Sequence, residues 1–177
     1  MSRSYFIKKL HSIHKSLLAT LITLATSASL VGLAHAEELP KQTYLPLDMA
    51  QKAANTALQK CSTDGYRVSV AVVDRSGVII VHLRASGAGP HTINSSVRKA
   101  YTAASMGRST LELAEFIKDK PELHGLRNMD NQILLLGGGL PIKLNGELVG
   151  GIGVGGTPSA PADDACAKAG LEGIGAQ

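Results

Sequence analysis

The sequence reads VSVAVVDRSGVIIVHLR from residue 68 to residue 84, and this stretch decides the fold class. Val68 to Val73 is a run rich in valine, and Val78 to Arg84 is a second, mostly apolar run of strand length. Between them lies Asp74-Arg75-Ser76-Gly77, which consists largely of residues that favour turns. We therefore expect a β-hairpin with strands at 68–73 and 78–84.

Helical patterns flank this hairpin on both sides. Before it, Asp48 is a suitable helix cap, and small apolar residues then recur at three- and four-residue spacing. These residues are Ala50, Ala53, Ala54, Ala57, Leu58 and Cys61. After the hairpin, a second helix is expected over His91–Ser105, and a capping box at Ser109 opens a short third helix that ends at Pro121.

The second half of the chain adds three strands and a helix. Ile133–Leu136 is expected to be a buried strand, and 141–144 and 147–155 to be a hairpin around Asn145-Gly146, a type I′ turn signal. A last helix is expected over Asp163–Gly170. Because hairpins dominate, we predict an α/β sandwich of the α+β kind, with a mainly antiparallel five-stranded sheet flanked by helices.

Residues 1–36 have the pattern of a secretory signal peptide. A basic start is followed by an uncharged run from Leu17 to Leu33 and by the cleavage pattern Ala34-His35-Ala36. An uncleaved membrane anchor is the alternative, but the hydroxyl residues within the run and its small-residue end favour cleavage. We expect a lead-in at 37–46, a globular domain at 47–177, and a periplasmic or secreted mature protein that is not held in a membrane.

The net charge of +4 comes from this leader. Its basic residues are Arg3, Lys8, Lys9 and Lys15. Without these four, 14 basic residues face 14 acidic ones, and the chain has 3% aromatic residues and no tryptophan. Proteins that bind DNA or RNA usually need a basic surface or aromatic stacking platforms, so we exclude nucleic acid as a partner.

The two cysteines, Cys61 and Cys166, both follow the leader. In an oxidising compartment they could form a disulfide that closes a loop spanning 105 positions, or they could be two unrelated buried thiols. The residues alone leave both possibilities open.

Gly151-Ile-Gly-Val-Gly-Gly156 matches the spacing of a dinucleotide-binding fingerprint, but its context does not fit. That fingerprint opens a helix, whereas Pro158 and Pro161 follow here. In a strand, alternate glycines instead form a bare strip on one face. A helix backbone, another subunit or a planar ligand must lie against such a strip.

A polar stripe follows one face of the second predicted helix, at a spacing of three, four or seven residues. Its members are His91, Asn94, Ser95, Arg98 and Thr102. A histidine near a helix N-terminus is biased towards its neutral, metal-ligating form, and an arginine in line with it could bind a carboxylate, although a solvated face is the simpler interpretation. The sequence has no zinc-site spacing and no nucleophile elbow, so it leaves open whether the protein is an enzyme.

An ordered series of sequence blocks resembles the GlcG/HbpS family, whose relatives include the C-terminal domain of PduO-type corrinoid adenosyltransferases. The blocks are Val70–Asp74 with Gly77, Leu83-Arg84, Gly87-Ala88, Arg98–Ala103, Gly138–Ile142, Gly146 and Gly150–Gly156. The resemblance implies a profilin-like domain that assembles into homo-oligomers and, in exported members, binds haem. It also implies that the first and last helices are neighbours, which favours a disulfide between Cys61 and Cys166.

The resemblance and the residue patterns together suggest a haem site. We expect His91 to be the axial ligand of the iron, and Arg98 and Lys99 to be partners of the haem carboxylates. Glycine backbone is expected to approach the porphyrin at Gly137, Gly138, Gly139, Gly151 and Gly153. After His91, the next candidates for the axial ligand are His82, Tyr101 and Thr110.

The function we expect is that of an exported haem-binding protein, an accessory in haem or iron handling or in redox sensing. Three alternatives remain open: a haem-degrading or small-molecule-converting enzyme, an interaction domain without a ligand, and a corrinoid-binding protein.

Overall fold

The computed structural model describes residues 38–177, so the expected signal peptide at 1–36 lies outside the described residues. The chain divides into two units, one ending at Lys41 and the other comprising Gln42–Gln177. In the described part of the first unit, Glu38 and Lys41 form an exposed ion pair. Among the described residues, no helix has the length and apolar character needed to cross a membrane. The fold described below is that of the second unit.

The elements follow one another as expected, except that one predicted strand is absent and that a 3-10 helix not predicted from the sequence is present. They are α2 (Leu47–Thr63), β1 (Ser69–Asp74), β2 (Ile79–Arg84), α3 (His91–Met106), α4 (Thr110–Ile117), the 3-10 helix η1 (Pro121–Asn128), β3 (Gly139–Leu144), β4 (Glu147–Gly155) and α5 (Ala160–Gly173). The strands form an antiparallel sheet in the order β2-β1-β4-β3. This confirms the mixed, mainly antiparallel fold class.

The two predicted hairpins are present. At the first turn, the carboxylate of Asp74 accepts hydrogen bonds from the amides of Ser76 and Val78, which fixes the reversal between β1 and β2. At the second turn, Asn145 and Gly146 both have positive φ angles, 51° and 82°, as a type I′ turn requires. These turns set the registers of the two hairpins, in which Ala71 of β1 lies opposite His82 of β2 and Gly139 of β3 lies opposite Gly153 of β4.

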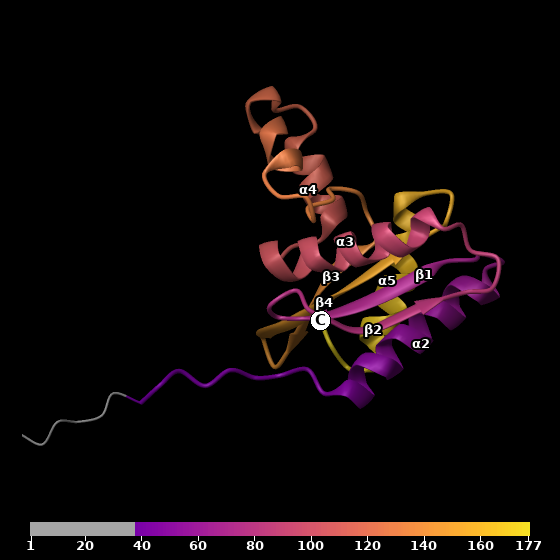
Figure 1. The fold of residues 1–177 in the computed structure, drawn as a ribbon, viewed down its shortest axis with the longest axis horizontal. Coiled ribbons are helices and arrows are strands. Elements are labelled where there is room, and N and C mark those ends of the chain that lie inside the picture. The colour runs from indigo at the N-terminus through magenta and orange to yellow at the C-terminus, as the bar shows by residue number, and fades with distance from the viewer. Residues whose placement is uncertain (1–37) are drawn as a thin grey trace, which may run out of the picture. The chain divides into compact units, whose positions relative to one another are not determined.

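Helices cover the sheet on both faces (Figure 1). Helices α2 and α5 pack together on one face, where alanines of α2 and the side chains of Ile152 and Val154 belong to the largest apolar core. Helix α3 lies on the other face, against β1 and β4, with a smaller core around Ala71 and Ala100. Helix α4 and η1 project away from the sheet beyond α3 (Figure 1).

A disulfide joins the first and last helices of the domain. Cys61 of α2 and Cys166 of α5 are fully buried, and their Cα atoms are 5.5 Å apart. This confirms the pairing that the family resemblance implied. Closing a loop of 105 positions stabilises the fold by about 4 to 5 kcal/mol in the chain-entropy account.

The predicted strand at Ile133–Leu136 is wrong, and the sheet has four strands instead of five. Ile133 and Leu135 are buried, as expected, and belong to a third apolar cluster, whereas Leu136 is 49% exposed. Its backbone, however, bonds to side chains of α3 and α4 instead of a neighbouring strand. Periodicity and burial resemble those of a strand, and only the hydrogen-bond partners differ.

Candidate functional site

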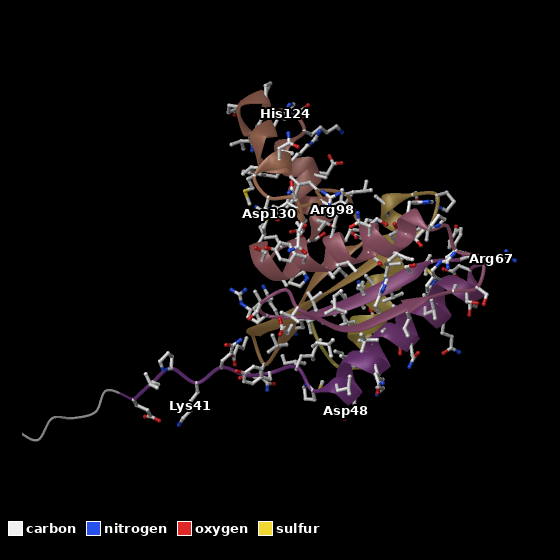
Figure 2. All side chains as sticks on the ribbon, in the orientation of Figure 1. Lys41, Asp48, Arg67, Arg98, His124 and Asp130 are labelled. Atoms are coloured by element: carbon white, nitrogen blue, oxygen red, sulfur yellow. A yellow bond between two sulfur atoms is a disulfide. The ribbon has the colours of Figure 1, made fainter. Side chains whose placement is uncertain are left out.

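Two residues of the polar stripe on α3, Arg98 and Thr102, bind the start of the segment 133–139 (Figure 2, where Arg98 is labelled). Arg98 Nη2 donates to the carbonyl oxygen of Ile133 at 2.6 Å, and Thr102 Oγ1 accepts from the amide of Leu134 at 2.8 Å. Buried backbone groups need such partners when no strand supplies them. The Arg98 guanidinium therefore binds a carbonyl of its own chain, where we expected it to bind a ligand carboxylate.

Thr110, at the start of α4, binds the other end of this segment. Its hydroxyl donates to the carbonyl oxygen of Leu136 at 2.8 Å and accepts from the amide of Gly139 at 2.8 Å. The residue is fully buried. Thr110 thus has a structural role here, and its hydroxyl is not exposed to a ligand at the surface.

Lys99 is buried and paired. Its ammonium group lies 2.7 Å from Asp163 Oδ2 and 2.9 Å from the carbonyl oxygen of Val154, and its side chain is 2% exposed. The second oxygen of Asp163 accepts from the amide of Thr157. Because both charges are satisfied inside the protein, the structure corrects the expectation that Lys99 meets a haem carboxylate.

The bare glycine strip of β4 is covered by α3 of the same chain. A methyl group on Gly153 would lie 2.5 Å from the amide nitrogen of Ala100, and one on Gly151 would lie 2.9 Å from the amide nitrogen of Ala104. Of the three occupants considered for this strip, the helix backbone is the one present. No room is left for a porphyrin there, which corrects the expectation for Gly151 and Gly153.

The loop of Gly137, Gly138 and Gly139 is also a place of close approach within the chain. Gly138 has a φ of 110°, and its amide donates to the carboxylate of Asp164. A methyl group on Gly139 would overlap the methyl of Thr110 at 2.6 Å. The glycines therefore allow the loop to pass between α3, α4 and the start of α5.

The predicted axial ligands lie apart from one another. His91 is exposed at the first position of α3, and the half-buried Tyr101 packs its ring over the turn at Gly77. His82 Nε2 lies 3.2 Å from Ser96 Oγ, and burial lowers the pKa of its imidazole. No group of three or more metal-binding side chains occurs within residues 38–177. His91 as an axial ligand stays a prediction.

Asp164 is the one carboxyl group beside the glycine loop whose pKa departs from its usual range. Burial raises the pKa of this carboxyl, and the charges of Asp163 and Glu112 add to the increase. The hydrogen bond from Gly138 and the charge of Lys99 oppose it without cancelling it. The loop is therefore bound by a carboxylate whose ionised form is disfavoured.

A cavity of about 570 Å³ lies beyond the C-terminal end of α3. It is bounded by the start of α4, the edge strand β3, the end of α5 and the last two residues of the chain. Its lining residues are Gly107, Arg108, Ser109, Glu112, Leu140, Pro141, Lys143, Lys168, Leu171, Glu172, Ala176 and Gln177. We call this cavity the β3 pocket. Such a volume is typical of small-molecule sites.

The β3 pocket has both apolar and charged lining residues. Leu140, Pro141 and Leu171 supply apolar surface, Arg108, Lys143 and Lys168 supply positive charge, and Glu112 and Glu172 supply negative charge. A ligand with an apolar body and charged substituents matches this arrangement.

Sequence reasoning missed the β3 pocket because its residues share no motif. Arg108 follows the glycine that ends α3, Lys143 lies in β3 and Lys168 in α5, so 60 positions separate the first from the last. A faint signal existed at Lys143, the single charged residue between Leu140 and Leu144. Only the fold brings the three cations together.

A family model described as "Haem degrading protein HbpS-like" matches residues 45–172, most of the described domain. The chain belongs to this family. The match confirms the resemblance found in the sequence blocks, and it includes both the loop 137–139 and the main part of the β3 pocket.

Solved structures support the assignment of this HbpS-like chain. It resembles a double mutant of Streptomyces reticuli HbpS with a TM-score of 0.72 and 43% sequence identity, covering 78% of this chain and 92% of that one. It also resembles PduOC, solved as a complex with haem, with a TM-score of 0.71 and 25% identity, covering 76% of this chain and 98% of that one.

A curated relative gives the same picture. Over 90 residues, 50% of this chain, the HbpS-like sequence is 31% identical to the corrinoid adenosyltransferase PduO of Salmonella typhimurium. The matched part is 27% of that relative's length. The chain therefore corresponds to one domain of PduO and not to the whole enzyme.

Proposed function

We propose that this chain binds haem. The observation that carries the proposal is the likeness to PduOC, whose structure was solved with haem, over nearly all of that chain. The family description and the 43% identity to HbpS support the same ligand. Bound haem would supply an iron centre for ligand binding or electron transfer.

The β3 pocket is the described cavity whose lining suits this ligand. Its volume of about 570 Å³ lies within the range of sites for small molecules and cofactors. Apolar side chains of β3 and α5 would contact the ring, and Arg108, Lys143 and Lys168 would bind the carboxylates. Glu112 and Glu172 also line the pocket, and the lining includes none of the usual protein ligands of haem iron.

The alternative location is the start of α3, where His91 is exposed. His91 is the first residue of this helix of 16 residues, and the pocket residue Gly107 follows its last residue. A helix of that length measures about 24 Å, so the two locations lie at opposite ends of α3. One haem in the β3 pocket is therefore out of reach of His91 in the same chain.

A titration of residues 37–177 with haemin, followed by absorbance, tests the function and its location. We expect a saturable shift of the Soret band that is lost in the triple variant Arg108→Gln, Lys143→Gln, Lys168→Gln and kept in His91→Ala. The matched control is Lys52→Gln, an exposed lysine of α2 outside the pocket. A shift lost only in His91→Ala would move the site to that end of α3, and no shift in the unmodified protein would refute haem binding.

Haem degradation is the second candidate function, and the description of the family is what favours it. Incubating the haem-loaded protein with ascorbate in air would distinguish the two. Loss of the Soret band with release of iron, beyond the rate with free haem, would identify an enzyme. A stable spectrum would identify a binding protein.

We also propose that the protein is exported. The leader pattern at 1–36 supports this, and so does the disulfide between Cys61 and Cys166, because structural disulfides persist mainly in oxidising compartments. Fractionation of cells followed by mass spectrometry of the N-terminus would test it, with Glu37 expected as the first residue. A chain that keeps Met1 would contradict the proposal. The homo-oligomer stays a prediction, which light scattering of the mature protein would test.

A further inference from the structure

We propose that residues 174–177 form a strap at one wall of the β3 pocket, and that a ligand enters and leaves the pocket when this strap releases β3. The strap joins the end of α5 to the edge strand β3, and its residues Ala176 and Gln177 belong to the pocket lining. This inference rests on the proposed function, because it takes the β3 pocket to be the ligand site. It adds the element that controls access to that site.

The strap begins with a sharp reversal at the end of α5. Gly175 has a φ of 69°, and its amide donates to the carbonyl oxygen of Glu172 at 3.2 Å. The amide of Ala176 donates to the carbonyl oxygen of Leu171 at 3.0 Å. These two bonds and the positive φ define a Schellman motif, in which glycine is preferred because a Cβ atom disfavours the left-handed conformation. The reversal turns the chain so that Gln177 reaches β3.

The strap is attached to the sheet at one residue of β3. The amide of Lys143 donates to the carbonyl oxygen of Gln177 at 3.0 Å, and the amide of Gln177 donates to the carbonyl oxygen of Lys143 at 3.1 Å. Within the described residues, no other backbone hydrogen bond joins the strap to β3. Two reciprocal bonds are what one residue of an antiparallel strand makes, so Gln177 covers the free edge of β3 at this position.

The strap is held more weakly than the helix from which it extends. Gly175 and Gln177 are exposed, and Ile174 and Ala176 are half-buried at the border of the largest core, whereas α5 is joined to α2 by the disulfide. Exposed hydrogen bonds and few buried apolar contacts lower the free energy of local opening, so we expect the strap to detach while the rest of the domain stays folded. Detachment removes Ala176 and Gln177 from the pocket wall and frees the backbone of Lys143.

The end of α2 supplies a matched control for the strap, because it has the same motif. Gly65 has a φ of 84°; its amide donates to the carbonyl oxygen of Ser62, and that of Tyr66 donates to the carbonyl oxygen of Cys61. A methyl group on Gly65 or on Gly175 would meet nothing within 4 Å in the described chain. Neither Gly65 nor Tyr66 lines the β3 pocket. Gly65→Ala and Gly175→Ala therefore strain the backbone alike, and the second of them acts on the strap.

The first measurement is hydrogen exchange of the Lys143 amide in residues 37–177 without ligand, followed by NMR. Gly175→Ala disfavours the closed strap, so we expect exchange about fivefold faster than in the unmodified protein. Truncation after Gly175 removes the acceptor of this amide and should accelerate exchange further. Gly65→Ala should leave the rate within about twofold, because it does not act on the strap. Urea denaturation of each variant shows that the domain stays folded.

The second measurement is the rate of haemin binding and release, followed by stopped-flow absorbance. A ligand passes through the open state in both directions, so a strap that opens more often raises the association and dissociation rates together. For Gly175→Ala we expect both rates to rise about fivefold and the affinity to stay within about twofold. For Gly65→Ala we expect both rates to stay as they are in the unmodified protein.

The outcomes separate this inference from the proposed function. Faster exchange at Lys143 together with faster haemin binding and release, in Gly175→Ala and not in Gly65→Ala, would support the inference. Equal exchange rates in the two variants would overturn it, because the strap would then open only with the whole fold. Faster exchange without a change in the haemin rates would also overturn it and leave haem binding intact. If haemin did not bind to the unmodified protein, the proposed function would be refuted, and the inference with it.

Discussion

Two regions next to α3, the α3–β4 interface and the β3 pocket, differ in how their polar residues are used. Beneath and beside the helix, the α3–β4 interface with the segment 133–139 is closed: Lys99 is paired with Asp163, and Arg98 binds a backbone carbonyl. Beyond the C-terminal end of the helix, the β3 pocket is lined by cations and carboxylates, and two of its cations, Lys143 and Lys168, form no ion pair within residues 38–177. A regular polar pattern on a helix can therefore serve the protein's own backbone, while a ligand site can be assembled from residues that have no pattern.

The largest effect that would distinguish the two regions is expected from Lys99→Met. Removing the ammonium group leaves Asp163 buried and unpaired, which lowers the free energy of unfolding by about 3 to 5 kcal/mol. Urea denaturation would measure this loss. The control is Lys60→Met, which breaks an exposed pair with Asp64 and should change stability by less than about 1 kcal/mol. Equal small effects would mean that the buried pair contributes little.

The close contact between α3 and β4 predicts the next effect. Gly153→Ala places a methyl group against the backbone of Ser96 and Ala100, and we expect a loss of about 3 kcal/mol of stability from overpacking. Thermal denaturation would measure it. The control is Gly125→Ala in η1, where a methyl group meets no atom within 4 Å. If both variants melt together with the unmodified protein, α3 does not lie tightly on the glycine strip.

In the β3 pocket a charge reversal should affect binding more than folding. Lys168→Glu replaces a positive charge in the pocket lining by a negative one that repels the haem carboxylates, so we expect haemin affinity to fall more than tenfold, about 1.5 kcal/mol or more. Because Lys168 is exposed, the free energy of unfolding should change by about 0.5 kcal/mol or less. Absorbance titration and urea denaturation of the same preparation would show whether the two quantities separate. If haemin affinity and the free energy of unfolding fell together, Lys168 would contribute to the stability of the fold.

The smallest effect concerns Asp164, at the loop between the two regions. Burial raises the pKa of this carboxyl in the folded protein above its usual 3.8, so its contribution to stability is complete below that value. The contribution is lost as the pH rises through the higher, folded-state pKa. The stability difference between the unmodified protein and Asp164→Asn should therefore shift in favour of the variant as the pH is raised from the ordinary carboxyl range towards neutrality. A difference independent of pH in urea denaturation would contradict this.

Local sequence patterns predicted the helices and hairpins well because these elements depend on residues that are near neighbours in the chain. The alanine stripe of α2 gave its buried face, and Asn145-Gly146 gave the β3–β4 turn through its positive φ angles. The prediction of a strand at Ile133–Leu136 was wrong because an apolar run indicates burial but does not indicate which groups the backbone binds. The ion pair of Lys99 could not be predicted for a similar reason, because its partner Asp163 lies 64 positions away in the chain.

The sequence by itself determined the helices, the hairpins, the bare glycine strip and, through its ordered blocks, the family. These features depend on the spacing between residues that are near neighbours in the chain, and the sequence alone gives that spacing. Only the tertiary structure decided that α3 fills the glycine strip, that Cys61 meets Cys166, and that Arg108, Lys143 and Lys168 surround one cavity. Such contacts join positions tens of residues apart, and their distances depend on how the whole chain packs.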